Sequence, residues 1–173
     1  MLEASTEFRK NGFNDQDAAT LGTLAAQFQN VSDEAITAGD SASFIISQMI
    51  AFGVEADNAS SIIDSVNEVA NQFSVSSGDL SKALGNVAST AGAMGNSMEE
   101  TLGMVTAITE QTRNASKASR SLNTIFSRLS QVTDENSDTG KKLTDIYNGL
   151  GIALYDSEGQ LRSSYDILTD LSK

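Results

Sequence analysis

The chain of 173 residues contains no cysteine and no histidine. Their absence removes the thiol nucleophile, the disulfide framework, the usual zinc ligands and the commonest general base near neutral pH. Few enzymes work without any of these groups. We therefore expect a protein that is not an enzyme, with no catalytic, cofactor-binding or metal-binding residues.

Proline and tryptophan are also absent, and aromatic residues make up only 6% of the chain. The core must then be built largely from alanine, valine, isoleucine and leucine. A buried leucine or isoleucine contributes about 1.5–3 kcal/mol and an alanine much less, which leaves little surplus over the entropy of ordering the chain. We expect marginal stability.

Basic residues are scarce, with 11 against 23 acidic residues and a net charge of −12. Most of this surface would repel a phosphate backbone, so nucleic acid is not an expected partner. The longest apolar runs, at 44–46 and 49–52, fall well short of the ~20 residues that a membrane span needs. The first five residues do not resemble a secretory signal, so we expect synthesis and initial residence in the cytoplasm.

Glycine and clusters of Asn, Ser and Asp divide the chain into amphipathic segments, a pattern typical of capped helices. Helices are expected after Asn14, from Asp40 or Ser41, from Asp57, after Ser76, after Ser97 and from about Asn114, with Asp17, Asp79 and Glu100 at the third position after their caps. Gly12 and Gly53 are expected at hairpin corners, and Gly92 with Gly95 at a helix end. The sequence predicts an all-α fold, a bundle or array of short antiparallel helical hairpins over residues 1–136.

The hairpins show signs of an internal repeat. A shift of 39 residues places Ile45 on Leu84 and Gly53 on Gly92, and a shift of 41 places Leu21 on Ile62. Two unrelated amphipathic hairpins would align about as well, so both interpretations stay open here.

Residues 137–173 differ in character from the rest. A short helix bearing Leu143 and Tyr147 precedes a segment, 152–162, whose pattern favours a small β-hairpin. A further helix is expected from Ser163 or Ser164, and the chain stops soon after it begins, which is typical of a fragment of a longer protein. Asp156 and Glu158 lie ahead of a glycine as in a calcium loop, but the distal glutamate of such a loop is missing, so a plain turn is expected.

Four basic residues follow helical spacing on this otherwise acidic chain: Arg113, Lys117, Arg120 and Arg128. One interpretation is that they pair with neighbouring Glu and Asp side chains. The other is that they form a stripe that docks on an acidic face of another copy.

Several phrases together resemble the tail tape measure proteins of long-tailed bacteriophages, in the branch common among prophages of Gram-positive bacteria. They are AFG at 51–53, VNEVAN at 66–71, VSSGDL at 75–80, GNSMEE at 95–100 and LGI at 150–152, in an order and spacing that match the core region of that family. The resemblance runs from about residue 31 to the C-terminus. Prolines that many relatives carry around the last of these segments are absent here.

The resemblance implies a structural protein that sets tail length. Several copies would lie along the tail axis while tube subunits polymerise around them, and the protein would leave through the tail ahead of the genome. The implied partners are other copies, tail tube proteins and tail assembly chaperones, and the implied location is the tail lumen, after the host cytoplasm during assembly. Two rivals stay open: a coiled-coil-like signalling or surface-adhesion segment, and part of a peptidoglycan-cutting polypeptide.

Overall fold

The computed structural model describes residues 2–32, 35–133 and 137–173. Within these residues the chain forms nine α-helices, two 3-10 turns and no strand, which confirms the predicted all-α class. The helices are α1 (Leu2–Lys10), α2 (Asp15–Val31), α3 (Ala38–Phe52), α4 (Ser60–Gln72), α5 (Ser77–Ala93), α6 (Met98–Thr112), α7 (Ala115–Ser130), α8 (Asp138–Gly149) and α9 (Ser164–Leu171). The predicted boundary at 136 lies outside the described residues.

Side-chain caps begin several of these helices where the sequence predicts them. Asn14, Ser76 and Asn114 each accept a hydrogen bond from the backbone N–H three residues on, at 2.8–3.0 Å. Ser97 and Glu100 form a reciprocal capping box, with distances of 3.1 and 2.8 Å. Each cap satisfies N–H groups that lack a partner inside the helix.

Two helix starts differ from the prediction. Helix α3 begins at Ala38, before Asp40, because Thr37 caps it and the Asp40 side chain completes a capping box with Thr37. Helix α4 begins at Ser60, after a separate 3-10 turn over Ala56–Asn58, and has no side-chain cap. The apolar periodicity alone did not resolve these first turns.

Glycines form the predicted corners, with one exception. Gly12 and Gly53 adopt the left-handed φ values of +91° and +67° that end α1 and α3. Helix α5 ends between Gly92 and Gly95, as predicted, but Gly92 is still helical because α5 continues to Ala93, and only Gly95 makes the turn, with φ +72°. A Cβ at Gly92 would lie 2.3 Å from the carbonyl oxygen of Ala51, so this glycine allows α5 to approach the end of α3.

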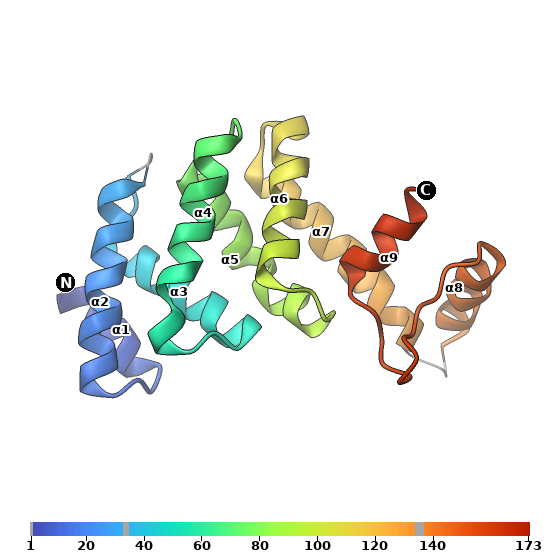
Figure 1. Cartoon of the computed structure of the whole chain (residues 1–173), viewed down its shortest axis with the longest axis horizontal. Helices are drawn as coiled ribbons and strands as arrows, with labels where there is room; N and C mark the ends of the chain where they lie inside the picture. Colours follow the sequence, from blue (N-terminus) through green and yellow to red (C-terminus); the bar gives the residue numbers. More distant parts are fainter. Residues whose placement is uncertain (1, 33–34, 134–136) are drawn as a thin grey trace.

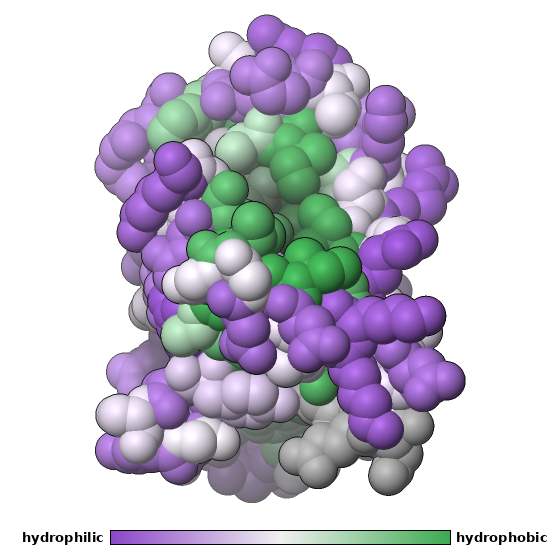
Figure 2. Space-filling model, turned by 90° about the vertical axis from the view of Figure 1, so that its right-hand side faces the viewer, coloured by the Kyte–Doolittle hydropathy of each residue, from purple (hydrophilic) through white to green (hydrophobic). Residues whose placement is uncertain are grey.

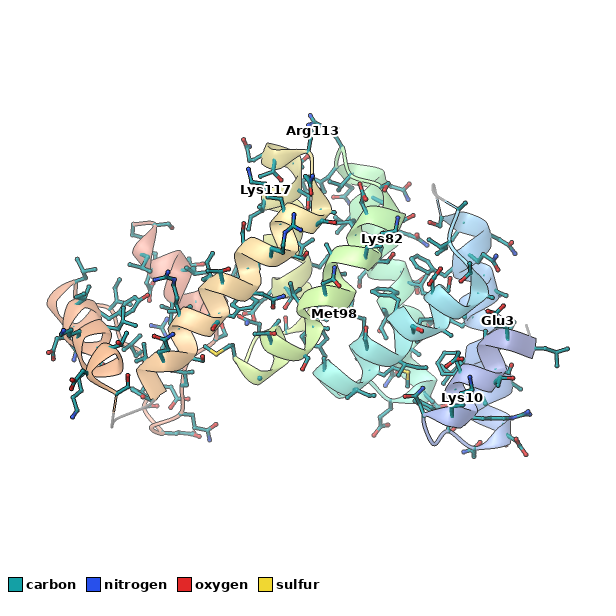
Figure 3. The ribbon with its side chains drawn as sticks, turned by 180° about the vertical axis from the view of Figure 1, so that it is seen from behind. Glu3, Lys10, Lys82, Met98, Arg113 and Lys117 are labelled. Atoms are coloured by element: carbon teal, nitrogen blue, oxygen red, sulfur yellow. The ribbon has the colours of Figure 1, made fainter. Side chains whose placement is uncertain are left out.

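The helices stack as hairpins in two layers (Figure 1). Helices α1, α3, α5 and α7 pack successively on one another and form the odd layer, seen in front when the molecule is viewed from behind (Figure 3). Helices α2, α4 and α6 form the even layer on the opposite side. This arrangement is the hairpin array predicted from the sequence. Helix α8 packs on the 3-10 turn after α7, and α9 lies beside α6.

The repeat offsets correspond to equivalent places in the array. Ile45 of α3 and Leu84 of α5 are both fully buried in the odd layer, and Leu21 of α2 and Ile62 of α4 are buried in the even layer. The hairpins α1–α2, α3–α4 and α5–α6 therefore follow one another as structural repeats, in which each hairpin buries its apolar face against its neighbours.

One continuous apolar cluster runs through the array, from Phe8 in α1 to Ile167 in α9. Phenylalanines anchor it, and the rings of Phe28 and Phe44 stack with centroids 5.6 Å apart. Alanine occupies many of the remaining core positions: Ala4, Ala18, Ala25, Ala42, Ala59, Ala83 and Ala91. Small side chains let the helices approach closely, but they add little hydrophobic stabilisation.

The β-hairpin predicted near 152–162 is wrong. The segment holds one isolated bridge between Tyr155 and Leu161, and no strand is present in the described residues. The Asp156 carboxylate accepts hydrogen bonds from the backbone N–H groups of Glu158 and Gln160, which closes a tight turn. The Arg162 guanidinium donates to the Ala153 carbonyl at 2.8 Å, where a longer ladder would place a backbone N–H. Backbone pairing is limited to the bonds from Asp156 N–H to the Gln160 carbonyl and from Arg162 N–H to the Leu154 carbonyl, both 2.9 Å, and side-chain hydrogen bonds complete the turn.

Candidate interaction surface

The described residues contain no constellation typical of an enzyme active site. Among the residues that the structure describes, no group of three acidic side chains converges where a metal ion would bind. The Asp156 carboxylate closes a turn, and Glu100 completes a helix cap, so both have structural roles. None of the described helices has the length and hydropathy that a membrane crossing requires. The informative features of this chain are therefore on its surface.

Helix α7 carries three of the four predicted stripe residues. Lys117, Arg120 and Arg128 are exposed, whereas Leu122 and Phe126 on the opposite side of the helix are buried in the core. At 100° per residue, the three cations fall within an arc of about 80° around the helix. Helix α7 contains no acidic residue, so this face, the α7 basic face, has charge of one sign.

Arg113 lies apart from the α7 basic face. It ends α6 in a left-handed conformation with φ +51°, and its guanidinium lies 3.4 Å from the carbonyl oxygen of Ser74. The Glu110 carboxylate accepts from the backbone N–H of the same Ser74, also at 3.4 Å. The structure thus places Lys117, Arg120 and Arg128 on one helix and Arg113 at the corner between α6 and α7.

None of the four predicted cations makes an ion pair with a carboxylate of the described residues. The ion pairs observed there join Arg9 to Asp15, Lys10 to Glu7, and both Arg162 and Lys173 to Asp170. No intramolecular partner was found for the α7 basic face within this part of the chain. Docking on another copy stays a prediction.

The even layer has the opposite charge. Helices α2, α4 and α6 contain acidic residues and no basic residue: Asp15, Asp17, Asp64, Glu68, Glu99, Glu100 and Glu110. The turn that leads into α4 adds Glu55 and Asp57. Sequence reasoning missed this segregation because nothing in the linear order says that alternate helices share a layer.

Two grooves cross the acidic side at equivalent places of the repeat. The first, of about 540 Å³, lies between α2 and the start of α4 and is lined by Asp17, Asp57 and Ser60 among others. The second, of about 470 Å³, lies between the α3–α4 and α5–α6 corners and is lined by Asn96 and Glu99. A shift of 39 residues places Asp57 on Asn96 and Ser60 on Glu99. The array therefore repeats a groove, bordered by Asp17 and Asp57 at the first place and by Glu99 at the second; we call these two the acid-lined grooves.

A separate apolar surface gathers toward the C-terminal end of the molecule. Viewed onto that end, apolar atoms occupy a central area bordered by polar ones (Figure 2). Ile146 and Leu150 of α8 are 56% and 61% exposed, and Leu171 of α9 is 41% exposed. Nothing in the structure shows what covers these residues.

Comparison with known proteins identifies a family. The whole chain, residues 1–173, matches the phage-related minor tail protein family. One relative, named tape measure protein, from Pneumococcus phage Dp-1, is 28% identical over an alignment of 167 residues, and the match covers 88% of this chain. The chain spans 14% of that relative's length. No solved structure gives a significant match. In agreement with the resemblance seen in its sequence, the chain belongs to the phage-related minor tail protein family and is a tape-measure-like structural protein of a phage tail.

Proposed function

We propose that this chain is a segment of a tape measure protein that sets tail length during assembly of the tail tube and is released through the tail on infection. The observation that carries the proposal is a capped, serially repeated helical array in a chain that belongs to a phage tail family. A serial array adds length in units, whereas an enzyme needs converging reactive groups. Its role is structural, not catalytic.

The same proposal supplies the partners and the location. Other copies of the chain, tail tube subunits and tail assembly chaperones would surround it in the host cytoplasm, and the mature protein would lie in the tail lumen. The family membership and the relative's name support this set of partners. The acidic even layer and net charge of −12 argue against nucleic acid as a binding partner.

The fold changes how this segment would measure length. A continuous α-helix advances ~1.5 Å per residue, so about 40 residues would span ~60 Å. Packed helices lie ~8–10 Å apart, so one hairpin of about 40 residues lengthens a side-by-side array by only about that distance. The segment would contribute little length while folded and much more if its hairpins opened.

Deleting one repeat in the encoding phage distinguishes these states. Removal of residues 54–92 joins Gly53 to Ala93, so that α3 takes the place of α5 before α6. We expect tails shorter by ~10 Å if the array stays folded during assembly, and by ~60 Å if it is extended, as measured by electron microscopy. Tails of unchanged length would contradict the proposed role. A length-neutral control, Ser116→Ala, should leave tail length unaltered.

The rival functions receive less support. A coiled-coil signalling or adhesion segment requires apolar heptads sustained over several turns, whereas the described helices end every 8 to 17 residues at caps and glycines. A role in peptidoglycan cleavage requires a reactive site, and the described residues bring no such group together. Release of soluble fragments from purified cell wall by this chain would overturn the structural assignment.

A further inference from the structure

We propose that two copies of this chain join face to back, with the α7 basic face of one copy seated on the acid-lined grooves of the even layer of the next. This inference rests on the proposed function, which requires several copies side by side, and it names the surfaces that would join them. A second copy is the occupant because the chain itself supplies both complementary surfaces.

The α7 basic face is suited to docking as a unit. Lys117 and Arg128 are separated by about 16 Å along the helix and differ by about 20° around it, so they point in nearly the same direction. Arg120 lies between them along the axis, and no carboxylate of the described residues pairs with any of the three. Beside Arg128 the surface is hollowed by a shallow depression lined by Asn123 and Gln131. An incoming acidic side chain would find a cation and amide groups there.

The acidic side offers unpaired charge at repeat spacing. Asp57 and Glu99 are exposed, and within the described residues neither side-chain carboxylate makes a hydrogen bond or an ion pair. They line successive grooves of the array. Packed helices lie ~8–10 Å apart and adjacent grooves are one hairpin apart, so cations spread over about 16 Å of α7 can reach two grooves at once.

The two surfaces lie on opposite sides of the molecule, which determines how copies would assemble. Lys117 is seen on the odd layer from behind (Figure 3), whereas the even layer faces the viewer in Figure 1. After two copies join through different surfaces, one copy still has its acidic side free and the other still has its α7 basic face free. Assembly therefore continues until the copies close into a ring, and it adds copies without covering the C-terminal apolar surface.

The test uses sedimentation velocity on the full chain at low and high salt. Wild-type chain should sediment as dimers or larger species at about 50 mM salt and as monomer at 1 M, where the Debye length falls to ~3 Å. Lys117→Glu with Arg120→Glu should weaken association about tenfold or more. Asp57→Lys with Glu99→Lys should have the same effect, although it lowers the net negative charge that would otherwise keep copies apart.

Mixing the two variants provides the decisive measurement. Each variant has one reversed surface, so an equimolar mixture should associate through acid-on-base contacts while neither variant associates alone. Both Glu substitutions lie in the first two turns of α7, where acidic side chains are favourable, so the variant is expected to fold. Circular dichroism checks this for both.

Matched controls separate a specific contact from net charge. Lys141→Glu with Lys142→Glu on α8 makes the same change in net charge as the α7 variant, and association should be unaffected. A wild-type chain that is monomeric at every salt concentration, or variants that associate like wild type, would overturn the proposed contact. Such results would not bear on the proposed role in tail length, which the repeat deletion tests separately. Unaltered tails after the repeat deletion would contradict that role and would not bear on the contact between copies.

Discussion

Glycine has two distinct structural roles at the scale of single residues. At Gly12 and Gly53 it supplies a left-handed backbone conformation that other residues rarely adopt. At Gly92 the backbone is helical, and the missing side chain is what matters, because the Ala51 carbonyl oxygen occupies the place of a Cβ. The first role is local, and the second depends on a neighbouring hairpin.

The close approach at Gly92 predicts the effect of a single methyl group. Gly92→Ala should destabilise the chain by about 1–3 kcal/mol, because α5 must move away from the end of α3. Gly103 in α6 is the matched control, since no atom outside its own helix lies within 4 Å of a Cβ built there. Gly103→Ala should stabilise the chain by about 0.5–1 kcal/mol through helix propensity. Urea titration measures both, and equal effects would contradict the assigned contact.

The helices of this fold depend for their stability on the residues that cap their ends. The helices are short, and most begin at a side-chain cap, because a segment of 8 to 17 residues is a marginal helix without tertiary contacts. Helix α6, like α3, begins with a reciprocal capping box, in which Ser97 and Glu100 exchange hydrogen bonds.

Removing the cap of α6 should cost a measurable part of the stability. Ser97→Ala leaves the backbone N–H of Glu100 without its partner, and we expect a loss of about 1 kcal/mol in the free energy of unfolding. Ser116→Ala, in the exposed first turn of α7, is the control and should change stability by no more than about 0.5 kcal/mol. The comparison requires urea unfolding of both variants at one pH. If Ser97→Ala left the free energy of unfolding unchanged, the cap would not contribute to stability.

We expect the stability of the last helix to depend on pH through Asp170. Hydrogen bonds from Lys173 and Arg162 hold the pKa of Asp170 below its usual range. A carboxyl group with a lowered pKa in the folded state adds stability above its unfolded pKa of ~3.9, and this contribution is lost as the pH falls through the folded value. We therefore expect α9 and the preceding turn to loosen below about pH 4, and not between pH 7 and 5.

Asp170→Asn tests this dependence. The variant should lose less stability than wild type when the pH is lowered from 5 to 2.5, because the titrating carboxylate has been removed. Carboxyl-carbon NMR gives the pKa of Asp170 directly. Parallel pH profiles for the two proteins, or an Asp170 pKa in the usual range, would contradict the role of the Lys173 and Arg162 hydrogen bonds.

The whole molecule combines a continuous core with small side chains. Because alanine occupies many core positions and each hairpin contacts mainly its neighbours, no part is stabilised by the entire array. This arrangement permits local opening of one hairpin at a time, which passage through a narrow tube would require.

We expect a free energy of unfolding below about 10 kcal/mol in urea, and graded hydrogen exchange along the chain. Amides of α3 and α5, which pack in the middle of the odd layer, should exchange more slowly than those of α1 and α9. Exchange of all helices at a single rate, or a stability well above 10 kcal/mol, would argue against stepwise opening.

Local interactions explain how much of this structure could be predicted. A cap such as Ser97 with Glu100 spans four residues, and a left-handed glycine such as Gly53 needs only its own backbone, so the sequence predicts both. The all-α class could also be predicted, because helical periodicity is a local pattern. The absence of cysteine and histidine is read directly from the sequence. The resemblance to phage tail tape measure proteins also came from linear phrases, because family similarity is recorded in residue order.

Tertiary structure decided everything that depends on which segments meet. Alternate helices share a layer only after the hairpins stack, so the separation of the α7 basic face from the acid-lined grooves is invisible in the sequence. Arg113 does not lie on the α7 basic face, because α6 ends at this residue and the chain reverses direction. Gly92 allows a close approach to Ala51, and the segment around Arg162 forms one isolated bridge where the sequence predicts a hairpin. Caps and apolar periodicity depend on residues close together in the sequence. These other features depend on residues that are distant in the sequence and that stacking of the helices brings within a few ångströms of one another.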